Sequence, residues 1–133
     1  MGPASIVARV FLTVIVSQAV SAADDQSELS RGPEIFQANC ATCHGPAGYP
    51  DVDSPLVKSL GVVPANFSDP LFNSREPSSD WKIVITRGGT ALGFSELMPA
   101  FGDSLSEEDI NAVLVYIKTL GGEHDYPDGD LNL

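Results

Sequence analysis

The sequence predicts an all-helical domain with long loops, and three observations support this class. Apolar residues recur at helical spacing after residue 106, Gly and Pro crowd the middle of the chain, and no useful stretch alternates between apolar and polar residues. A chain of 133 residues suffices for one small domain and is too short for two ordinary ones. We therefore expect three to four short helices around one core.

The first 22 residues have the pattern of a secretory signal peptide. Arg9 is their only charged residue, residues 10–20 are mostly apolar, and Val20-Ser21-Ala22 ends the stretch with small side chains. This stretch is shorter than the ~20 residues of a membrane-spanning helix. We expect cleavage after about Ala22, export of the protein, and no transmembrane segment in the mature chain. The expected division is residues 1–22 as leader, 23–122 as domain and 123–133 as an acidic tail.

The first predicted helix covers residues 32–39. Pro33 then falls in its first turn, where the missing N–H has no effect on helix hydrogen bonding. Residues 45–77 contain many helix breakers and are predicted to be mostly loop, with a helical turn at 55–60. A second helix is predicted at about 80–87, capped by Ser78 or Ser79 and ended by two glycines.

The last predicted helix follows Ser106, whose spacing to Asp109 is typical of a capping box. Apolar residues then recur at i, i+3, i+4 and i+7 and define one buried face: Ile110, Val113, Leu114 and Ile117. Short helices and long loops bury little apolar surface, so a domain of this kind needs another group to fill its centre.

Residues 40–44 read Cys-Ala-Thr-Cys-His, the C-x-x-C-H signature of covalent haem attachment. Two cysteines three positions apart share one face of a helical turn, so Cys40 and Cys43 can both reach the vinyl groups of one haem. His44 follows and can direct a ring nitrogen to the iron. The alternatives are a zinc site, which normally needs four ligands and for which only His124 remains as a Cys or His candidate outside the motif, and a redox dithiol, which belongs in an α/β pattern.

The opposite face of the iron needs a ligand or an opening. Beyond the predicted leader the chain has one methionine, Met98, and one further histidine, His124. Pro99 keeps Met98 extended in a loop, which suits a side chain that reaches out to a metal. His124 lies in the Gly- and Pro-containing tail and is better explained as a solvated residue. Met98 is therefore the predicted second axial ligand.

The formal charge of −11 disfavours nucleic-acid binding, which requires a basic surface. Loss of the leader would leave six Lys and Arg against eighteen Asp and Glu, a charge of −12. Such a surface favours encounters with redox partners that carry basic docking patches, although acidic residues also serve solubility alone.

The sequence resembles class I monohaem c-type cytochromes, the His/Met-ligated bacterial electron carriers of the periplasm, on the strength of the Cys40–His44 motif and Met98-Pro99. The resemblance implies a small cytochrome c fold around one haem c, a covalently bound iron protoporphyrin, with His44 and Met98 as axial ligands. It also implies that the first and last helices cross, with Gly32 and Phe36 facing a set on the last helix: Val113, Tyr116 and Ile117.

The resemblance further implies that a proline carbonyl accepts the His44 ring N–H, with Pro55 as first choice and Pro64 as second. Trp81 or Arg87 is expected to meet a haem propionate. The apolar surroundings of the haem, any of which could be ordinary core, are expected among seven residues: Phe36, Phe67, Trp81, Leu92, Phe94, Phe101 and Leu114.

The function expected from these residues is one-electron transfer in the periplasm by a monomeric, non-enzymatic carrier, because a closed six-coordinate iron binds no substrate. One alternative is a haem c subunit of a larger dehydrogenase or terminal oxidase. Another is a gas sensor or small peroxidase, which would need an open iron position and is disfavoured by Met98.

Overall fold

The computed structural model describes residues 1–2 and 21–122, and all regular structure in them is helical. The elements are α1 (Ser21–Asn39), α2 (Ala41–His44), α3 (Pro55–Leu60), α4 (Pro70–Arg75), α5 (Ser78–Arg87), a 3₁₀ turn η1 (Gly89–Leu92) and α6 (Glu107–Thr119). The prediction of an all-helical fold is confirmed. Most of the predicted leader, the acidic tail and His124 lie outside the described residues. Within the described part, no helix combines the length and the apolarity needed to span a membrane.

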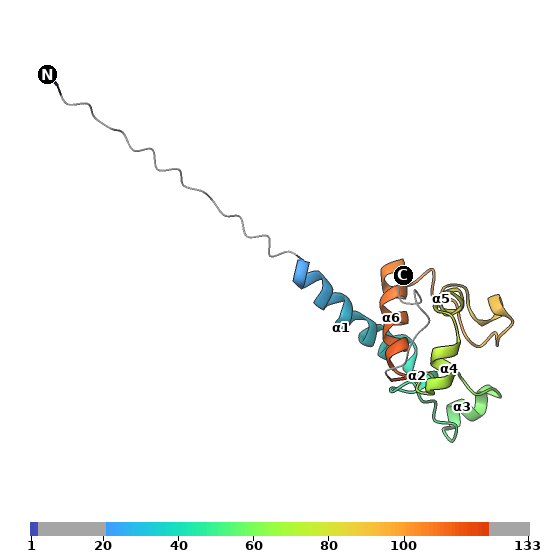
Figure 1. Cartoon of the computed structure of the whole chain (residues 1–133). Coiled ribbons are helices and arrows are strands. Elements are labelled where there is room, and N and C mark those ends of the chain that lie inside the picture. Colours follow the sequence, from blue (N-terminus) through green and yellow to red (C-terminus); the bar gives the residue numbers. More distant parts are fainter. Residues whose placement is uncertain (3–20, 123–133) are drawn as a thin grey trace.

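Helix α1 begins at Ser21, so the prediction that it starts at Gly32 was wrong. Pro33 lies inside the helix and not in its first turn. The sequence before Pro33 includes good helix formers such as Gln, Glu and Leu. The N-terminal part of α1 projects from the body, while its C-terminal part lies beside α6 (Figure 1).

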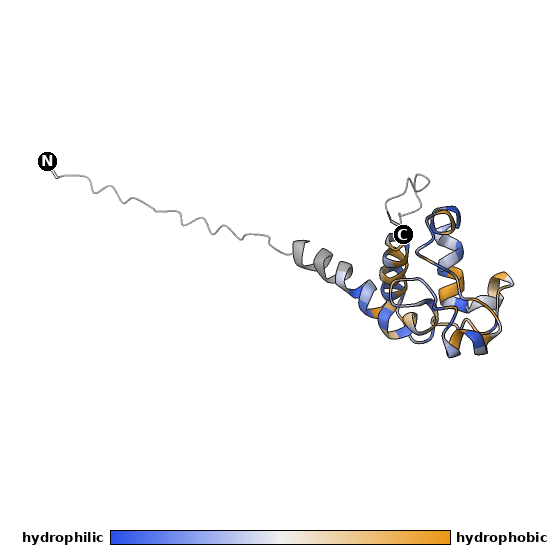
Figure 2. Ribbon diagram, turned by 90° about the horizontal axis from the view of Figure 1, so that it is seen from below, coloured by the Kyte–Doolittle hydropathy of each residue, from blue (hydrophilic) through white to orange (hydrophobic). Residues whose placement is uncertain are grey.

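The crossing of α1 and α6 forms the centre of the core. Phe36 is fully buried and meets the ring of Tyr116 edge-on, with 5.4 Å between ring centroids. Helix α6 carries both hydrophobic and hydrophilic positions (Figure 2). Its buried face contains the four residues predicted from the periodicity: Ile110, Val113, Leu114 and Ile117. The predicted capping box between Ser106 and Asp109 is also present.

Two short helices lie in the stretch that the sequence predicted to be mostly loop. The expected turn at 55–60 is α3, which Ser54 caps by accepting from the Val57 N–H. Helix α4 was missed: Asp69 caps it, and Pro70 occupies a first-turn position that tolerates proline. In this stretch, some prolines therefore lie at the first turns of helices and others lie in loops.

Helix α5 starts at Ser78, and its N-cap residue Pro77 makes no side-chain capping bond. The expectation that Ser78 or Ser79 caps this helix was wrong, because both serines lie within its first turn. The segment after the helix folds back on it, since Phe101 donates its N–H to the Ile85 carbonyl at 2.9 Å. Gly102 does the same to Thr86 at 3.0 Å. These two bonds fix the loop that carries Met98 against α5.

Candidate functional site

The Cys40–His44 motif forms one helical turn that follows α1 directly in the chain. The Cys40 N–H donates to the Phe36 carbonyl at 2.8 Å, and the His44 N–H donates to the Cys40 carbonyl at 3.0 Å. Gly45 ends the turn with a φ of +78°, a conformation that an L side chain rarely adopts. The structure therefore brings both thiols and the imidazole together on a segment anchored to the core helix.

The two thiols are half-buried and unbonded to each other. Burial, with a smaller contribution from Cys43, raises the pKa of the Cys40 thiol to about 11. Redox-active dithiols instead hold a thiolate through a lowered pKa, so the arrangement disfavours the dithiol alternative. Among the side chains that the structure describes, no three His, Cys, Asp or Glu form a group able to hold a metal ion.

The His44 ring is oriented by a backbone carbonyl. Its Nδ1–H donates to the Ala65 oxygen at 3.0 Å; a carbonyl can only accept, so the proton lies on Nδ1 and the lone pair on Nε2. The acceptor expected from the sequence was Pro55, and the structure corrects this choice. Pro55 instead starts α3, whereas Ala65 is held nearby because the Phe67 N–H donates to the Gly48 carbonyl at 2.8 Å.

The Phe67 ring supports the imidazole from one side. The two rings are stacked at 20°, with 4.5 Å between centroids. Buried Asn73 fixes this part of the chain, because its Nδ2 donates to the carbonyls of Phe67 at 2.8 Å and Ile117 at 2.9 Å. Burial lowers the pKa of His44, and the bond to Ala65 opposes that shift. The result favours the neutral imidazole, the form that ligates metals.

Met98 lies in a tight loop attached to the end of α5. Its carbonyl accepts from the Gly89 N–H at 2.9 Å, and its own N–H donates to Ser95 at 3.2 Å. A Cβ at Gly89 would lie 2.3 Å from the Ser95 oxygen, so only glycine fits there. The Met98 side chain is half-buried. The methionine is thus held in a defined segment separate from the Cys40–His44 turn.

The seven apolar residues expected around the haem divide into two groups. Four are buried core residues, and Phe101 packs against them: Phe36, Phe67, Trp81 and Leu114. The other two flank the Met98 loop and are exposed by 38% at Leu92 and 61% at Phe94. These two are not ordinary core, although both are large and apolar.

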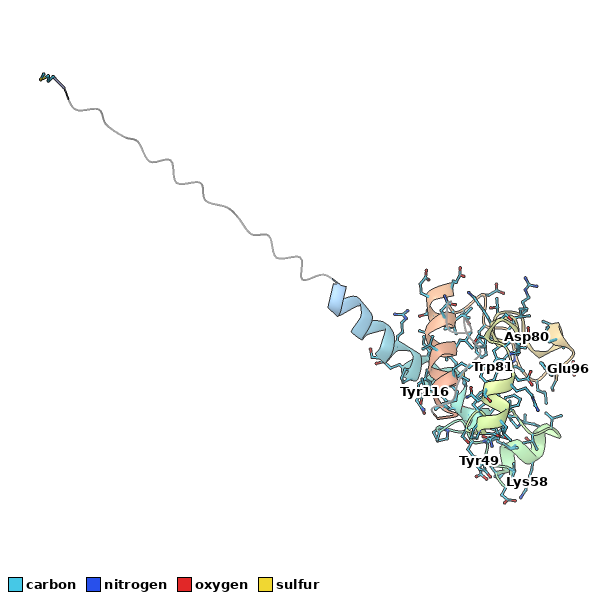
Figure 3. The ribbon with its side chains drawn as sticks, in the orientation of Figure 1. Tyr49, Lys58, Asp80, Trp81, Glu96 and Tyr116 are labelled. Atoms are coloured by element: carbon cyan, nitrogen blue, oxygen red, sulfur yellow. The ribbon has the colours of Figure 1, made fainter. Side chains whose placement is uncertain are left out.

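The two candidate propionate partners lie in different surroundings. Trp81 is buried, with its ring 5.3 Å from Phe67 and 5.7 Å from Phe72 between centroids. Arg87 is exposed in the last turn of α5. Figure 3 shows Trp81 in the interior and Glu96 at the periphery of the segment that carries Met98. A role at a propionate remains a prediction for both residues.

Three residues of this region were not predicted from the sequence: Ala65, Asn73 and Lys118. Ala65 acts through its backbone, and Asn73 through contacts between distant segments, so neither gave a local signal. Lys118 did give one, because it follows Leu114 at i+4 on the apolar face of α6. It is 1% exposed.

Comparison with known proteins shows one consistent similarity. Residues 27–117 match the family described as cytochrome C oxidase, cbb3-type, subunit III. The chain is 36% identical over 102 residues to the cbb3-type cytochrome c oxidase subunit FixP of Azorhizobium caulinodans, covering 77% of the chain and 30% of that protein. It is 25% identical over 100 residues to subunit CcoP of Azospirillum sp. strain B510, covering 75% of the chain and 31% of the relative. The chain thus spans about a third of the length of the curated relatives it matches.

Proposed function

Because the chain belongs to the cbb3-type cytochrome c oxidase subunit III family of c-type cytochromes, we propose that it is a haem c electron-transfer component of a terminal oxidase complex. Its fold is the small all-helical cytochrome c fold, and haem c is its cofactor. The sequence alone placed a free periplasmic shuttle first and a bound oxidase subunit second. The family and its relatives support the second alternative better.

The observation that carries the proposal is the orientation of His44 beside two free thiols. Donation from Nδ1 to Ala65 leaves Nε2 available, and the carbonyl fixes the ring as metal-ligating histidines require. Cys40 and Cys43 lie on the same turn, as two thioether bonds to one haem require. The donor set therefore fits a covalently held haem, with one C-x-x-C-H motif for one haem.

Each residue then has a distinct task, while bound haem supplies a one-electron ferric–ferrous couple. Cys40 and Cys43 would hold the group covalently, and His44 would ligate the iron from Nε2. Met98 is the proposed sixth ligand, whose soft, neutral sulfur favours the reduced state. The exposed side chains of Leu92, Phe94 and Leu97 flank Met98 and supply an apolar wall. With both ligand positions taken by His44 and Met98, the site would transfer electrons without binding substrate.

The covalent attachment is tested by producing the protein together with cytochrome c maturation factors. We expect haem staining after denaturing electrophoresis and one haem per chain by the pyridine haemochrome assay. The double variant Cys40→Ala/Cys43→Ala should lose the stain, whereas the control Thr42→Ala, between the two cysteines, should retain it. Absence of covalent haem in the parent protein would contradict the proposal.

The bound-subunit role is tested by tagging the chain in its native host and solubilising membranes in mild detergent. We expect the tag to recover a complex with cytochrome c oxidase activity and a catalytic oxidase subunit. Recovery of a haem-containing protein without any oxidase subunit would instead favour the free shuttle. The size of the protein recovered without oxidase subunits shows whether it is a monomer, as expected from the sequence.

The leader, the tail and the periplasmic location are part of the proposal. Intact mass and N-terminal sequencing of exported protein should give a chain that begins at about Ala23. Retention of residues 1–22 would indicate an anchored N-terminus. Helix α1 includes the expected cleavage point after Ala22 in the uncleaved chain.

A further inference from the structure

Lys118 is a buried cation held at the end of α4. Its ammonium donates to the carbonyls of Asn73 at 3.0 Å and Glu76 at 2.6 Å. It also lies 4.5 Å from the centroid of the Trp81 ring. Lysine is rarely buried so completely, and the two carbonyls and the ring face hold the ammonium in one position.

Three ring contacts connect this cation to the proposed iron ligand. Lys118 faces Trp81, and Trp81 lies 5.3 Å from Phe67 between centroids. Phe67 in turn stacks on the His44 imidazole at 4.5 Å. The side chains between the charge and the imidazole are thus two buried aromatic rings rather than solvent (Trp81 is labelled in Figure 3).

We propose that Lys118 is a positioning residue that sets the reduction potential of the haem through its fixed, buried charge. This inference rests on the haem site of the proposed function and adds a regulator of its energetics. A positive charge in a poorly screened interior opposes the ferric state, which carries one more positive charge than the ferrous state. Addition of one electron to the iron becomes more favourable, so the potential rises.

The second role of Lys118 is structural, because its bonds to Asn73 and Glu76 satisfy carbonyls at the end of α4. A test must therefore separate charge from packing. Lys118→Met keeps the unbranched apolar stem and removes the ammonium. Lys118→Gln also removes the charge but retains an N–H donor, which serves if the methionine variant fails to fold. Lys118→Arg restores the charge.

The matched control is Lys82→Met. Lys82 follows Trp81 on the same helix, but its ammonium pairs with Glu107 at 3.0 Å in an exposed ion pair. Both substitutions remove one positive charge, so a general effect of net charge would shift both proteins equally. Only the buried site should couple strongly to the haem.

The measurement is a spectroelectrochemical titration of each haem-loaded protein, together with its visible spectrum and thermal unfolding. We expect Lys118→Met or Lys118→Gln to lower the potential by about 59 mV, a tenfold change in the one-electron equilibrium constant. Lys118→Arg keeps the charge and should have a reduction potential close to that of the parent. Lys82→Met should shift the reduction potential far less than Lys118→Met does. A correctly ligated Lys118 variant with the potential of the control overturns the inference. Failure of the parent chain to take up haem would instead overturn the proposed function.

Discussion

Gly32 of α1 lies directly against Ala112 of α6. A Cβ at Gly32 would fall 2.3 Å from the Ala112 carbonyl oxygen and 2.9 Å from the Tyr116 Cβ. The backbones of the two helices can approach this closely only where one has no side chain. One turn later, Phe36 fills the space against Tyr116, so the pair Gly32 and Phe36 defines the crossing that the resemblance implied.

Replacement of Gly32 by alanine should destabilise the folded protein by about 2 kcal/mol, because one helix must move to admit the methyl group. Urea unfolding of the haem-loaded protein measures this loss. Ala38→Ser, at an exposed position of the same helix, is the control and should change the free energy of unfolding by less than about 0.5 kcal/mol. A Gly32→Ala protein as stable as the control would show that the helices separate without penalty.

Replacement of Met98 by alanine should open the iron while leaving the haem covalently attached. We expect the weak near-infrared sulfur-to-iron absorption band to disappear and the spectrum to become high-spin and responsive to carbon monoxide. Glu96→Gln changes an exposed side chain two residues away in the same loop and should retain the parent spectrum. If the parent protein already lacks the band and binds carbon monoxide, the sensor or peroxidase alternative gains support.

The contact between Arg31 and Asp109 should make the α1–α6 crossing sensitive to acid. The Arg31 guanidinium donates to the Asp109 carboxylate, and this bond lowers the Asp109 pKa below its ordinary value of 3.8. A group whose pKa is lowered by folding contributes stability above its unfolded-state pKa and loses it as pH falls through the folded-state value. The contribution is therefore complete at neutral pH and disappears only in strong acid.

The pH test compares urea midpoints of the parent and Asp109→Asn at about pH 6 and about pH 3. At the higher pH we expect the parent to be more stable than Asp109→Asn. At the lower pH we expect the difference in stability between the two proteins to become smaller. Asp103→Asn, an exposed carboxylate before α6, controls for net charge. If the difference in stability between the parent and Asp109→Asn stays constant across this pH range, the Arg31–Asp109 contact is not the source of the acid sensitivity.

The charge of −11 should steer the protein toward basic partners. We expect the rate constant for electron transfer to a lysine-rich redox protein to fall about tenfold as ionic strength rises from about 0.01 to 0.15 M. A neutral small-molecule reductant provides the control and should react at a nearly constant rate. A rate that stays flat or rises with the basic partner would leave solubility as the role of the acidic surface.

Some features could be predicted because their signals are local. Helix α6 combines a capping box with apolar residues on one face, and the Cys40–His44 turn needs only a spacing of three residues. Other features depend on distant segments. The sequence indicated Pro55 as the acceptor for His44, yet the Gly48–Phe67 bond presents Ala65 instead. Helix α4 was missed because the prolines around it indicated a loop. Only the structure shows that Pro70 lies in the first turn of a helix.

The sequence by itself determined the helical class, the haem attachment motif and the single candidate methionine after the predicted leader. Each of these can be read from residue types and their spacing along the chain. The tertiary structure decided which carbonyl orients His44, how closely α1 approaches α6 and which cation is buried. Lys118 shows the physical reason. Its charge becomes internal only when α4, α5 and α6 pack around it, and that environment belongs to no single segment.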